Sequence, residues 1–388
     1  MRILHVFPIF SLQHGAGVAS VIFSLCKALK ARGHEVTVLT SNYRFDPAFA
    51  ARLSGVEVMP MRSLLSAQGF FITPGLGRWL DRRLPGFDVV HLHVYRSYQS
   101  ILSHRYCGKH GVPYVLDPHG AVLRFDRKRR VKRIFDTLIG RRVLADACRI
   151  VAETHVSAEE LRTVGADTTR VVVMAPPLDT EDFSVLPPQG TFRRAYAMEG
   201  KRLVMYLGRI AWIKGIDFLV EGFNQLIGQD RPEDVHLVLA GPDQGFKGEV
   251  QRMIARLDIG DRVTFTGFLD GEMKLAALQD ADVVVQTSRF ESWGLAPFEA
   301  ILCGTPIVVT KGTGLGEAVS RLDAGYVVPF GDKKELADAL ARALDDRSEI
   351  QAKAERAKSY IQTHMSLSAR VHDYEELYAA CTGARGRA

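Results

Sequence analysis

Two cations and two carboxylates in the second half of the chain have the types and spacing to bind a phosphorylated, hydroxyl-rich ligand. Arg209 and Lys214 lie five residues apart after a short apolar run. Such cations form strong charge-assisted hydrogen bonds with phosphate oxygens. Glu291 and Glu299 follow with seven residues between them, and carboxylates accept hydrogen bonds from sugar hydroxyls. Taken alone, the two cations are better interpreted as ordinary surface residues.

The segment between the two glutamates predicts an anion site at the start of a helix. The residues that lead from a strand end into this helix are Ser292, Trp293, Gly294 and Leu295. Gly294 lets the backbone approach a ligand closely, and the free N–H groups that open a helix point at an anion. The alternative makes Glu291 a cap-like residue and Glu299 a solvated helix residue, although the helix around Glu299 is largely apolar.

The first half of the chain offers a glycine loop and a histidine. Gly15 and Gly17 follow the first apolar run and suggest a loop that approaches phosphate, although a plain strand-to-helix turn is an equal interpretation. His119, in Asp117-Pro118-His119-Gly120, ends another apolar run. A neutral imidazole can donate or accept a hydrogen bond near pH 7. An isolated histidine at such a place is more often structural.

A basic run follows this histidine. Its candidate residues are Arg124, Arg127, Lys128, Arg129, Arg130, Lys132 and Arg133. The cations open a predicted helix that becomes apolar from Ile134 onward. A solvated face is one interpretation, and the other is contact with an anionic acceptor such as a polyprenyl-diphosphate sugar, or with the membrane that carries it. Stacking aromatics do not interleave the run, so nucleic acid is not an expected partner.

These side chains need a scaffold, and short β-branched runs predict two parallel sheets. Several runs are apolar on successive residues, which is typical of strands buried on both faces. The first set of predicted strands is Ile3–Phe7, Glu35–Thr40, Val56–Met59, Val89–Val94, Tyr114–Leu116, Arg149–Ala152 and Val171–Met174. The second set is Leu203–Leu207, His236–Ala240, Val263–Thr266, Val283–Gln286, Ile307–Val309 and Tyr326–Val328. Strands and helices alternate at βαβ spacing, which predicts two doubly wound α/β domains.

The domain boundary is expected where proline and glycine cluster, between Pro176 and Gly200. We expect a Rossmann-like domain over residues 1–180, a linker over 181–200 and a second Rossmann-like domain over 201–363. A helix over 364–388 would then cross back to the first domain. The two domains are expected to face each other across a cleft, with ligands at the carboxyl ends of the strands that line it.

The second half resembles the large family of retaining GT-B glycosyltransferases that includes sucrose synthase and bacterial mannosyltransferases. Glu291 and Glu299 match the family's Glu-x7-Glu motif. The other matching motifs, in chain order, are Gly208-Arg209, Lys214-Gly215, Leu239-Ala240-Gly241, Val263–Phe268, Cys303–Val308 and Gly314-x-x-Glu317. None of these pieces is specific alone, and the ordered set over about 110 residues carries the resemblance.

The resemblance implies roles for individual residues. Arg209, after Gly208, and Lys214 would neutralise the donor diphosphate, while the amides after Gly294 would contact its distal phosphate. Glu299 would bind the ribose, Glu291 a hydroxyl of the transferred sugar, and the backbone around Phe268 the nucleobase.

In the first half the family's glycine loop, here Gly15-Ala16-Gly17, would close over the phosphates, and His119 would contact the transferred sugar. The family's Asn-Gly-(Val/Ile)-Asp is replaced by Pro176-Pro177-Leu178-Asp179, so the contacts of that Asn-Gly are not expected.

The resemblance further implies a retaining hexosyltransferase that needs neither a metal nor a cofactor. Its donor would be GDP-mannose or a UDP-hexose bound by the second domain. Its acceptor would be a glycan or polyprenyl-diphosphate-linked saccharide, in polysaccharide or glycoconjugate biosynthesis. The pair Asp280 and Asp282 imitates a metal motif, but its place before an apolar strand predicts a structural role. Two alternatives stay open: a sugar-nucleotide epimerase of the same architecture, and an inactive nucleotide-sugar-binding subunit.

Composition sets the remaining limits. A chain of 388 residues with 47% hydrophobic and 24% charged residues is typical of a soluble two-domain protein. The start reads as a strand rather than as a secretory signal, and apolar runs are too short to cross a membrane. The five cysteines are scattered and odd in number, which argues against a disulfide framework and predicts a reducing cytoplasm, with peripheral binding to the inner face of the membrane as an option.

Overall fold

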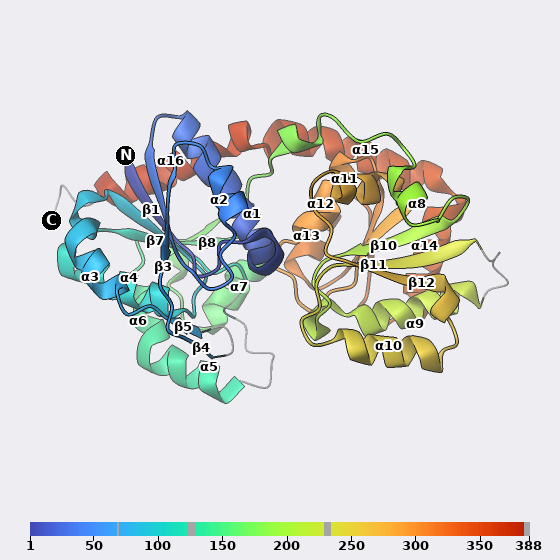
Figure 1. Ribbon diagram of the computed structural model, residues 1–388, viewed down its shortest axis with the longest axis horizontal. Coiled ribbons are helices and arrows are strands. Elements are labelled where there is room, and N and C mark those ends of the chain that lie inside the picture. Colours follow the sequence, from blue (N-terminus) through green and yellow to red (C-terminus); the bar gives the residue numbers. More distant parts are fainter. Residues whose placement is uncertain (68–69, 121, 123–128, 229–233, 384–388) are drawn as a thin grey trace. The chain divides into compact units, whose positions relative to one another are not determined.

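The computed structural model describes residues 1–67, 70–120, 122, 129–228 and 234–383 (Figure 1). The chain divides into two compact units. Unit 1 comprises Met1–Leu178 together with Met365–Ala388, and unit 2 comprises Asp179–His364. Each has its own parallel sheet with helices on its faces, as the sequence predicts for two doubly wound α/β domains. Among the described residues, every helix is too short or too polar to span a bilayer.

Within its described residues, unit 1 contains a seven-stranded parallel sheet in the order β3-β2-β1-β6-β7-β8-β9. Its strands are β1 (Arg2–Val6), β2 (Glu35–Ser41), β3 (Glu57–Met61), β6 (Val89–His93), β7 (Tyr114–Asp117), β8 (Arg149–Ala152) and β9 (Val171–Val173). All seven predicted strands are confirmed, with small shifts at their ends. The sequence analysis missed a separate antiparallel pair, β4 (Leu65–Ala67) and β5 (Phe70–Ile72).

Alternation along the strands divides the core of unit 1 between the two faces of the sheet. Ile3 and Val89 pack on the face covered by α1 and α16, whereas Leu4 and Val90 belong to the cluster on the opposite face. The helices are α1 (Leu12–Ala31), α2 (Pro47–Ala51), α3 (Leu76–Arg83), α4 (Tyr98–His110), α5 (Arg129–Phe135), α6 (Arg141–Ala145), α7 (His155–Thr163) and α16 (Leu367–Gly383). A π-helical turn, Asp136–Gly140, joins α5 to α6.

The expected glycine loop is wrong in its local structure. Helix α1 begins at Leu12, with Ser11 accepting a hydrogen bond from the His14 amide as its cap, so Gly15 and Gly17 lie inside the helix. A Cβ added at Gly15 would lie 2.4 Å from the Ile9 carbonyl oxygen. This close approach of the backbone accounts for a glycine at position 15, inside the first turns of the helix.

Within its described residues, unit 2 contains a six-stranded parallel sheet in the order β12-β11-β10-β13-β14-β15, and all six predicted strands are confirmed. The strands are β10 (Arg202–Leu207), β11 (Val235–Ala240), β12 (Val263–Gly267), β13 (Val283–Gln286), β14 (Ile307–Thr310) and β15 (Tyr326–Val328). The helices are α8 (Thr191–Ala195), α9 (Ile216–Ile227), α10 (Lys247–Arg256), α11 (Gly271–Asp280), α12 (Leu295–Leu302), α13 (Gly314–Leu322), α14 (Lys333–Asp345) and α15 (Arg347–His364).

The segment expected to be a linker packs against unit 2. The Asp280 carboxylate accepts hydrogen bonds from the Gly190 and Phe192 amides at 2.7 and 2.8 Å, and the Phe192 ring is fully buried. After α15 the chain returns to unit 1, where Leu178 and Met365 share a main-chain hydrogen bond of 2.9 Å. The prolines predict a domain boundary here, but they do not predict that Asp280, about 90 residues later in the sequence, holds this segment in place.

The sequence argues against a disulfide framework, but two of the five cysteines, Cys148 and Cys381, are paired. They form a disulfide with their Cα atoms 5.8 Å apart, within the usual range. The two are 233 residues apart in sequence, and they meet because α16 returns to unit 1. Sequence spacing alone does not predict such a pairing.

Candidate active site

The predicted donor residues of unit 2 follow the carboxyl ends of its central strands. Arg209 comes after β10, Phe268 after β12 and Glu291 after β13. Because the strands are parallel, these ends share one edge of the sheet. The parallel sheet therefore brings residues that are far apart in the sequence to the same edge.

Lys214 and Glu291 form the centre of this group. The Lys214 ammonium donates to Glu291 Oε2, and the side chains are 13% and 12% exposed. Ser288 Oγ and Gln286 Nε2 lie 3.1 and 3.4 Å from the same oxygen. The sequence analysis missed these two polar residues, whose only signal is their position at the end of an apolar strand.

The loop that carries Lys214 needs a glycine next to it. Gly215 has a φ of +63°, and an added Cβ would lie 2.0 Å from the Thr287 carbonyl oxygen. Thr287 also donates from Oγ1 to the Gly215 carbonyl at 3.0 Å. Lys214 is therefore held against the end of β13 by backbone packing that tolerates no side chain at the next residue.

Arg209 does not share the contacts of Lys214. Its guanidinium donates to Gln244 Oε1 at 2.8 Å, and its carbonyl accepts a hydrogen bond from the buried Tyr206 hydroxyl at 2.8 Å. The backbone at Arg209 is thus anchored, while its side chain lies against a neutral amide. The two predicted diphosphate cations have different partners in the structure.

The start of α12 has the geometry predicted for an anion site. Gly294 has a φ of +79°, and an added Cβ would lie 3.2 Å from Glu291 Cγ and from Leu315 Cδ2. In the part of the chain that the structure describes, no side chain caps this helix. Trp293 is instead buried and stacks on Phe298, with ring centroids 4.7 Å apart, so it supports the turn from inside. Ser292 and Leu295 flank this turn on either side.

Glu299 has a partner that the sequence analysis missed. Lys274 of α11 donates from Nζ to Glu299 Oε1 at 2.9 Å. The same ammonium lies 6.0 Å from the centroid of the Phe183 ring. The alternative of a simple solvated glutamate is therefore wrong, because Glu299 is paired with Lys274.

The carboxylates of the metal-like motif have structural partners, as the sequence predicts. Asp280 holds the amides before and within α8. Asp282 accepts hydrogen bonds from the Leu203 amide at 2.6 Å and from Arg193 at 2.8 Å, and it pairs with Arg347 at 3.0 Å. These contacts join α8, β10 and α15 around the start of β13.

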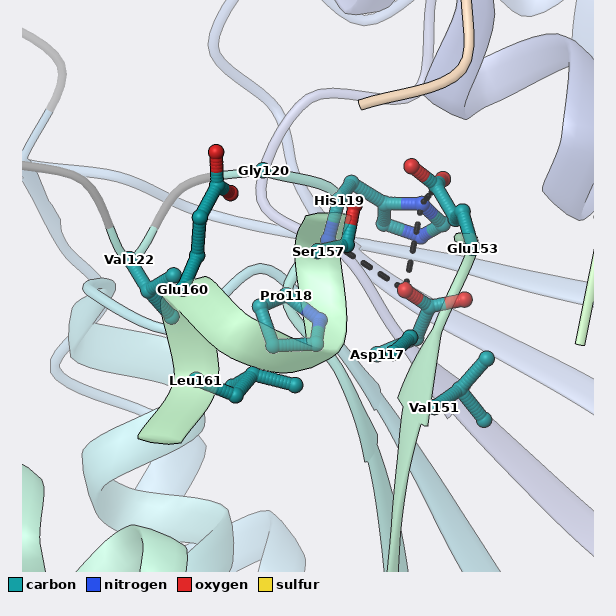
Figure 2. Close-up of a pocket in the computed structure, with 11 residues that line it drawn as sticks. Asp117, Pro118, His119, Gly120, Val122, Val151, Glu153, Ser157, Glu160 and Leu161 are labelled. Atoms are coloured by element: carbon teal, nitrogen blue, oxygen red, sulfur yellow. Dashed lines mark hydrogen bonds and ion pairs between the residues drawn. The ribbon is translucent and has the colours of Figure 1, made fainter. Parts of the chain in front are cut away.

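In unit 1, His119 lines a small pocket together with Asp117, Glu153 and Glu160. Figure 2 shows Asp117 and Glu153 beside the His119 ring, and Glu160 on another side of the pocket. His119 Nδ1 lies 3.0 Å from Glu153 Oε1, and Nε2 lies 3.0 Å from His93 Nδ1. Both ring nitrogens are therefore engaged within unit 1, and the His119 side chain is 3% exposed.

The pocket shifts the titration of its acids. Burial raises the pKa of Asp117 to about 7, a shift that His119 opposes and Glu153 reinforces. Burial and the nearby Glu153 raise the pKa of Glu160 to about 7. Burial alone would lower the pKa of His119, but Asp117 and the hydrogen bond with Glu153 outweigh it, so that pKa is raised. The pocket is thus lined by carboxyl groups around one imidazole, a set that can accept hydrogen bonds from hydroxyl or ammonium groups.

The basic run lies only partly within the described residues. Arg124, Arg127 and Lys128 fall outside them, and Arg129 and Arg130 are described only as the first backbone residues of α5. Lys132 and Arg133 follow on the same helix. The side chains of Ile134 and Leu138, four residues apart, are 59% and 68% exposed.

Comparisons with known proteins agree with this architecture. Residues 189–363 match the model of "Glycosyl transferases group 1", and residues 15–182 match that of "Glycosyltransferase Family 4". The D-inositol 3-phosphate glycosyltransferase of Actinosynnema mirum is 30% identical over 352 residues, covering 84% of this chain and 83% of the relative. The enzyme of the same name from Jonesia denitrificans is 29% identical, covering 92% and 90%.

A solved structure supports the fold. The Anabaena protein HepE in complex with UDP and glucose superposes with a TM-score of 0.82 at 18% identity, covering 98% of this chain and 100% of that one. With both sheets and both halves matched, the chain belongs to the group 1, or family 4, glycosyltransferases, which transfer a sugar from a nucleotide sugar.

Proposed function

We propose that this protein is a retaining hexosyltransferase whose donor diphosphate binds between Lys214, Arg209 and the start of α12. The observation that carries the proposal is the Lys214–Glu291 pair beside the turn at Gly294. Glu291 would accept a hydrogen bond from the transferred sugar, and Glu299 from the ribose. The surface around Phe268, which is 37% exposed, would contact the base.

The proposed chemistry is departure of the nucleotide diphosphate from the same face that the acceptor hydroxyl attacks. The leaving phosphate accepts the acceptor proton, so the chain itself need not supply a general base. Its main contribution is to stabilise charge that develops on the diphosphate. A bound diphosphate would share the Lys214 ammonium with Glu291, which leaves the glutamate oxygen oriented for a sugar hydroxyl.

Two donor classes, UDP-hexoses and GDP-mannose, are compatible with this proposal. The similarity to the UDP complex of Anabaena HepE favours UDP-hexoses. A thermal-melt series with UDP, GDP, ADP and dTDP separates them. A ligand at 100 times its dissociation constant stabilises the folded protein by about 2.7 kcal/mol, which is several degrees for domains of this size. A shift with one nucleotide identifies the donor class. No shift with any nucleotide contradicts the proposal. A shift without sugar transfer to any acceptor would favour an inactive nucleotide-sugar-binding subunit.

We further propose that donor binding needs no metal ion, because Asp280 and Asp282 already hold main-chain and arginine donors. The same melt series with and without Mg²⁺ tests this. Equal shifts support a metal-free site. Complete loss of transfer in a chelator, restored by Mg²⁺, contradicts it.

For the acceptor, we propose a glycan or a lipid-linked saccharide bound by unit 1. The pocket beside His119 supplies hydrogen-bond acceptors for hydroxyl groups. Phosphorylated polyols belong in the same screen, because curated relatives are named for D-inositol 3-phosphate. Transfer from the donor found above to a panel of free and lipid-linked saccharides identifies the class. Interconversion of the nucleotide sugar without any acceptor would favour an epimerase instead.

The helix after the pocket supports peripheral binding to an anionic membrane. Phe135 and Ile139 pack against the core, while Ile134 and Leu138 point away from it beside exposed Arg133 and Arg141. An apolar strip flanked by cations suits the interface of an anionic bilayer. We expect sedimentation with phosphatidylglycerol vesicles, weakened in Ile134→Ser/Leu138→Ser and retained in the surface control Val185→Ser. Equal binding by both variants contradicts the proposal.

A further inference from the structure

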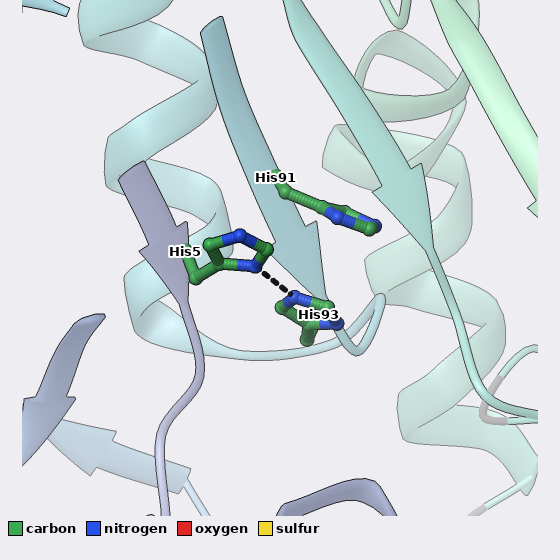
Figure 3. A group of neighbouring side chains, drawn as sticks. All are labelled: His5, His91 and His93. Carbon is green, nitrogen blue, oxygen red and sulfur yellow. Dashed lines mark hydrogen bonds between the residues drawn. The ribbon is translucent and has the colours of Figure 1, made fainter. Parts of the chain in front are cut away.

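Four histidines of unit 1 form a buried row across three neighbouring strands. His5 lies on β1, His91 and His93 lie on β6, and His119 follows β7. His5 pairs in register with His91, and His93 pairs with Asp117. Register partners and residues two apart on a strand share a face, so these side chains project together toward α1 and α16. Figure 3 shows His5 joined to His93, with His91 beside them.

Three hydrogen bonds connect this row into a chain that ends on a carboxylate. His5 Nδ1 lies 2.9 Å from His93 Nε2, His93 Nδ1 lies 3.0 Å from His119 Nε2, and His119 Nδ1 lies 3.0 Å from Glu153 Oε1. The rings are stacked, with centroids 5.3 Å apart for both His5–His93 and His93–His119. Figure 2 shows the carboxylate end of the chain at the pocket.

The Glu153 carboxylate determines which nitrogen donates and which accepts in each hydrogen bond of this series. A neutral imidazole has one donor and one acceptor nitrogen. When the three rings are neutral and Glu153 accepts from His119 Nδ1–H, His119 Nε2 must accept from His93 Nδ1–H. His93 Nε2 in turn must accept from His5 Nδ1–H. One anion therefore determines the tautomer of three successive rings.

We propose that His93, His5 and Glu153 are positioning residues that hold His119 in a single tautomer and ring orientation at the acceptor pocket. The proposal rests on the proposed function, which places the acceptor substrate in the pocket beside His119. None of the three need touch the substrate. Their effect reaches the site through the His119 ring and through the turn that carries it.

Two energetically unfavourable features indicate that the histidine row does more than fill the core. His119 has a φ of +48°, a left-handed conformation that is strained for a residue with a side chain. Among the described residues, buried His5 Nε2 has no hydrogen-bond partner. Apolar side chains of similar size would fill this face without either an unsatisfied nitrogen or a strained turn. Hydrogen bonds on both ring nitrogens fix the His119 side chain, and its amide donates to Asp117 Oδ1 at 3.2 Å within the turn.

Among the described residues, the side chains that pack against the histidine row all belong to unit 1. His91 Nδ1 lies 2.8 Å from the Tyr378 hydroxyl of α16, so His91 is held separately from the chain. Tyr374 of α16 lies over the same face, where its pKa is raised mainly by burial and further by Asp117 and Glu153. Helix α16 therefore keeps water from the row. His91 offers a matched control, since it is equally buried on the same strand but lies outside the chain.

The test compares two substitutions at one position. His93→Leu removes both hydrogen bonds, whereas the amide of His93→Asn reproduces the donor to His119. We expect kcat to fall about tenfold or more in His93→Leu, the equivalent of at least one lost buried hydrogen bond, and to recover in His93→Asn. The donor KM and the nucleotide-induced melt shift should stay unchanged in both, because the donor site lies in unit 2. His91→Asn should keep a kcat close to wild type.

Long-range ¹H–¹⁵N spectra of histidine-labelled protein give an independent readout. In wild type, His5, His93 and His119 should each show a protonated Nδ1, and His119 should become a tautomer mixture in His93→Leu and Glu153→Gln. Equal kcat losses in both His93 variants and in His91→Asn, or an unchanged His119 tautomer, would overturn the proposal. So would stoichiometric Zn²⁺ in the purified protein that is lost in His5→Ala, because one ring nitrogen each of His5, His91 and His93 lie within 4.8 Å of one another. If the wild-type protein transfers no sugar, the proposed function fails. The spectra still show whether His5, His93 and His119 share one set of tautomers.

Discussion

The candidate donor site of unit 2 and the groups around His119 in unit 1 are built by different means. In unit 2 the residues proposed to bind the donor lie in short loops after β10 and β13, where Gly215 and Gly294 allow close approaches of the backbone. In unit 1 the groups around His119 are side chains on separate strands, held by hydrogen bonds among themselves and covered by a helix from the end of the chain.

This difference suits the two tasks. Backbone amides at a helix start and a nearby cation can stabilise the charge of any nucleotide diphosphate, and they need little adjustment when the base changes. A buried network of imidazoles and carboxyl groups holds one geometry, because each unpaired polar atom in it is costly. Substitutions should therefore act locally in unit 2 and through several partners in unit 1.

The largest effect is expected at Lys214. Lys214→Ala removes a charged hydrogen bond to the proposed diphosphate and leaves Glu291 without its cation. We expect kcat/KM to fall roughly 10–150-fold, the equivalent of about 1.5–3 kcal/mol. The control is Lys333→Ala, which removes an exposed lysine paired with Glu221 in the same unit. Wild-type turnover in Lys214→Ala would contradict its role in charge stabilisation.

A smaller effect is expected where the backbone of unit 2 is altered. Gly294→Ala places a methyl group 3.2 Å from Glu291 Cγ at a φ of +79°. Gly331→Ala introduces comparable backbone strain at a φ of +95°, with no atom within 4 Å of the new methyl group. Both should lose about 1–2 kcal/mol of stability, the cost of a side chain in the left-handed region.

Only Gly294→Ala should also weaken nucleotide binding, because only its methyl group displaces Glu291 and the start of α12. Melt curves with and without the nucleotide separate the two effects. Equal melt shifts in the two variants would show that the turn does not contact the donor.

The same difference explains what the sequence could predict. The strands were readable because buried parallel strands are apolar on successive residues, as in Val283–Val285. The residues predicted to bind the donor come from short local motifs, such as Gly294 beside Leu295, and their role stays a prediction. Lys274 was missed because its partner Glu299 is 25 residues away on another helix. The histidine row was missed for a similar reason, since it depends on strand register.

A third and smaller effect, on stability, is expected at Tyr378 of α16, which packs over the histidine row. Tyr378→Phe removes the hydroxyl that contacts His91 Nδ1 without changing the packing of the ring. We expect a loss of about 0.5–1.5 kcal/mol in the free energy of unfolding, typical of one buried hydrogen bond. Urea unfolding followed by tryptophan fluorescence and circular dichroism measures it. The nucleotide-induced melt shift should not change, and a change would mean that the two units are coupled through α16.

The smallest effect concerns the outer side of the same helix. Glu375 pairs with Arg32 and His34 on unit 1, and these contacts, led by the Arg32 hydrogen bond, lower its pKa to about 2 from a usual 4.5. Since the folded pKa is the lower one, the ionised carboxylate stabilises the folded state fully above pH 4.5. That contribution is lost as the pH falls toward 2. Glu375→Gln should therefore melt below wild type at pH 6 to 7, and the two curves should converge on acidification. A constant difference between pH 7 and pH 3 would mean that packing of α16, rather than its charge, is what the substitution disturbs.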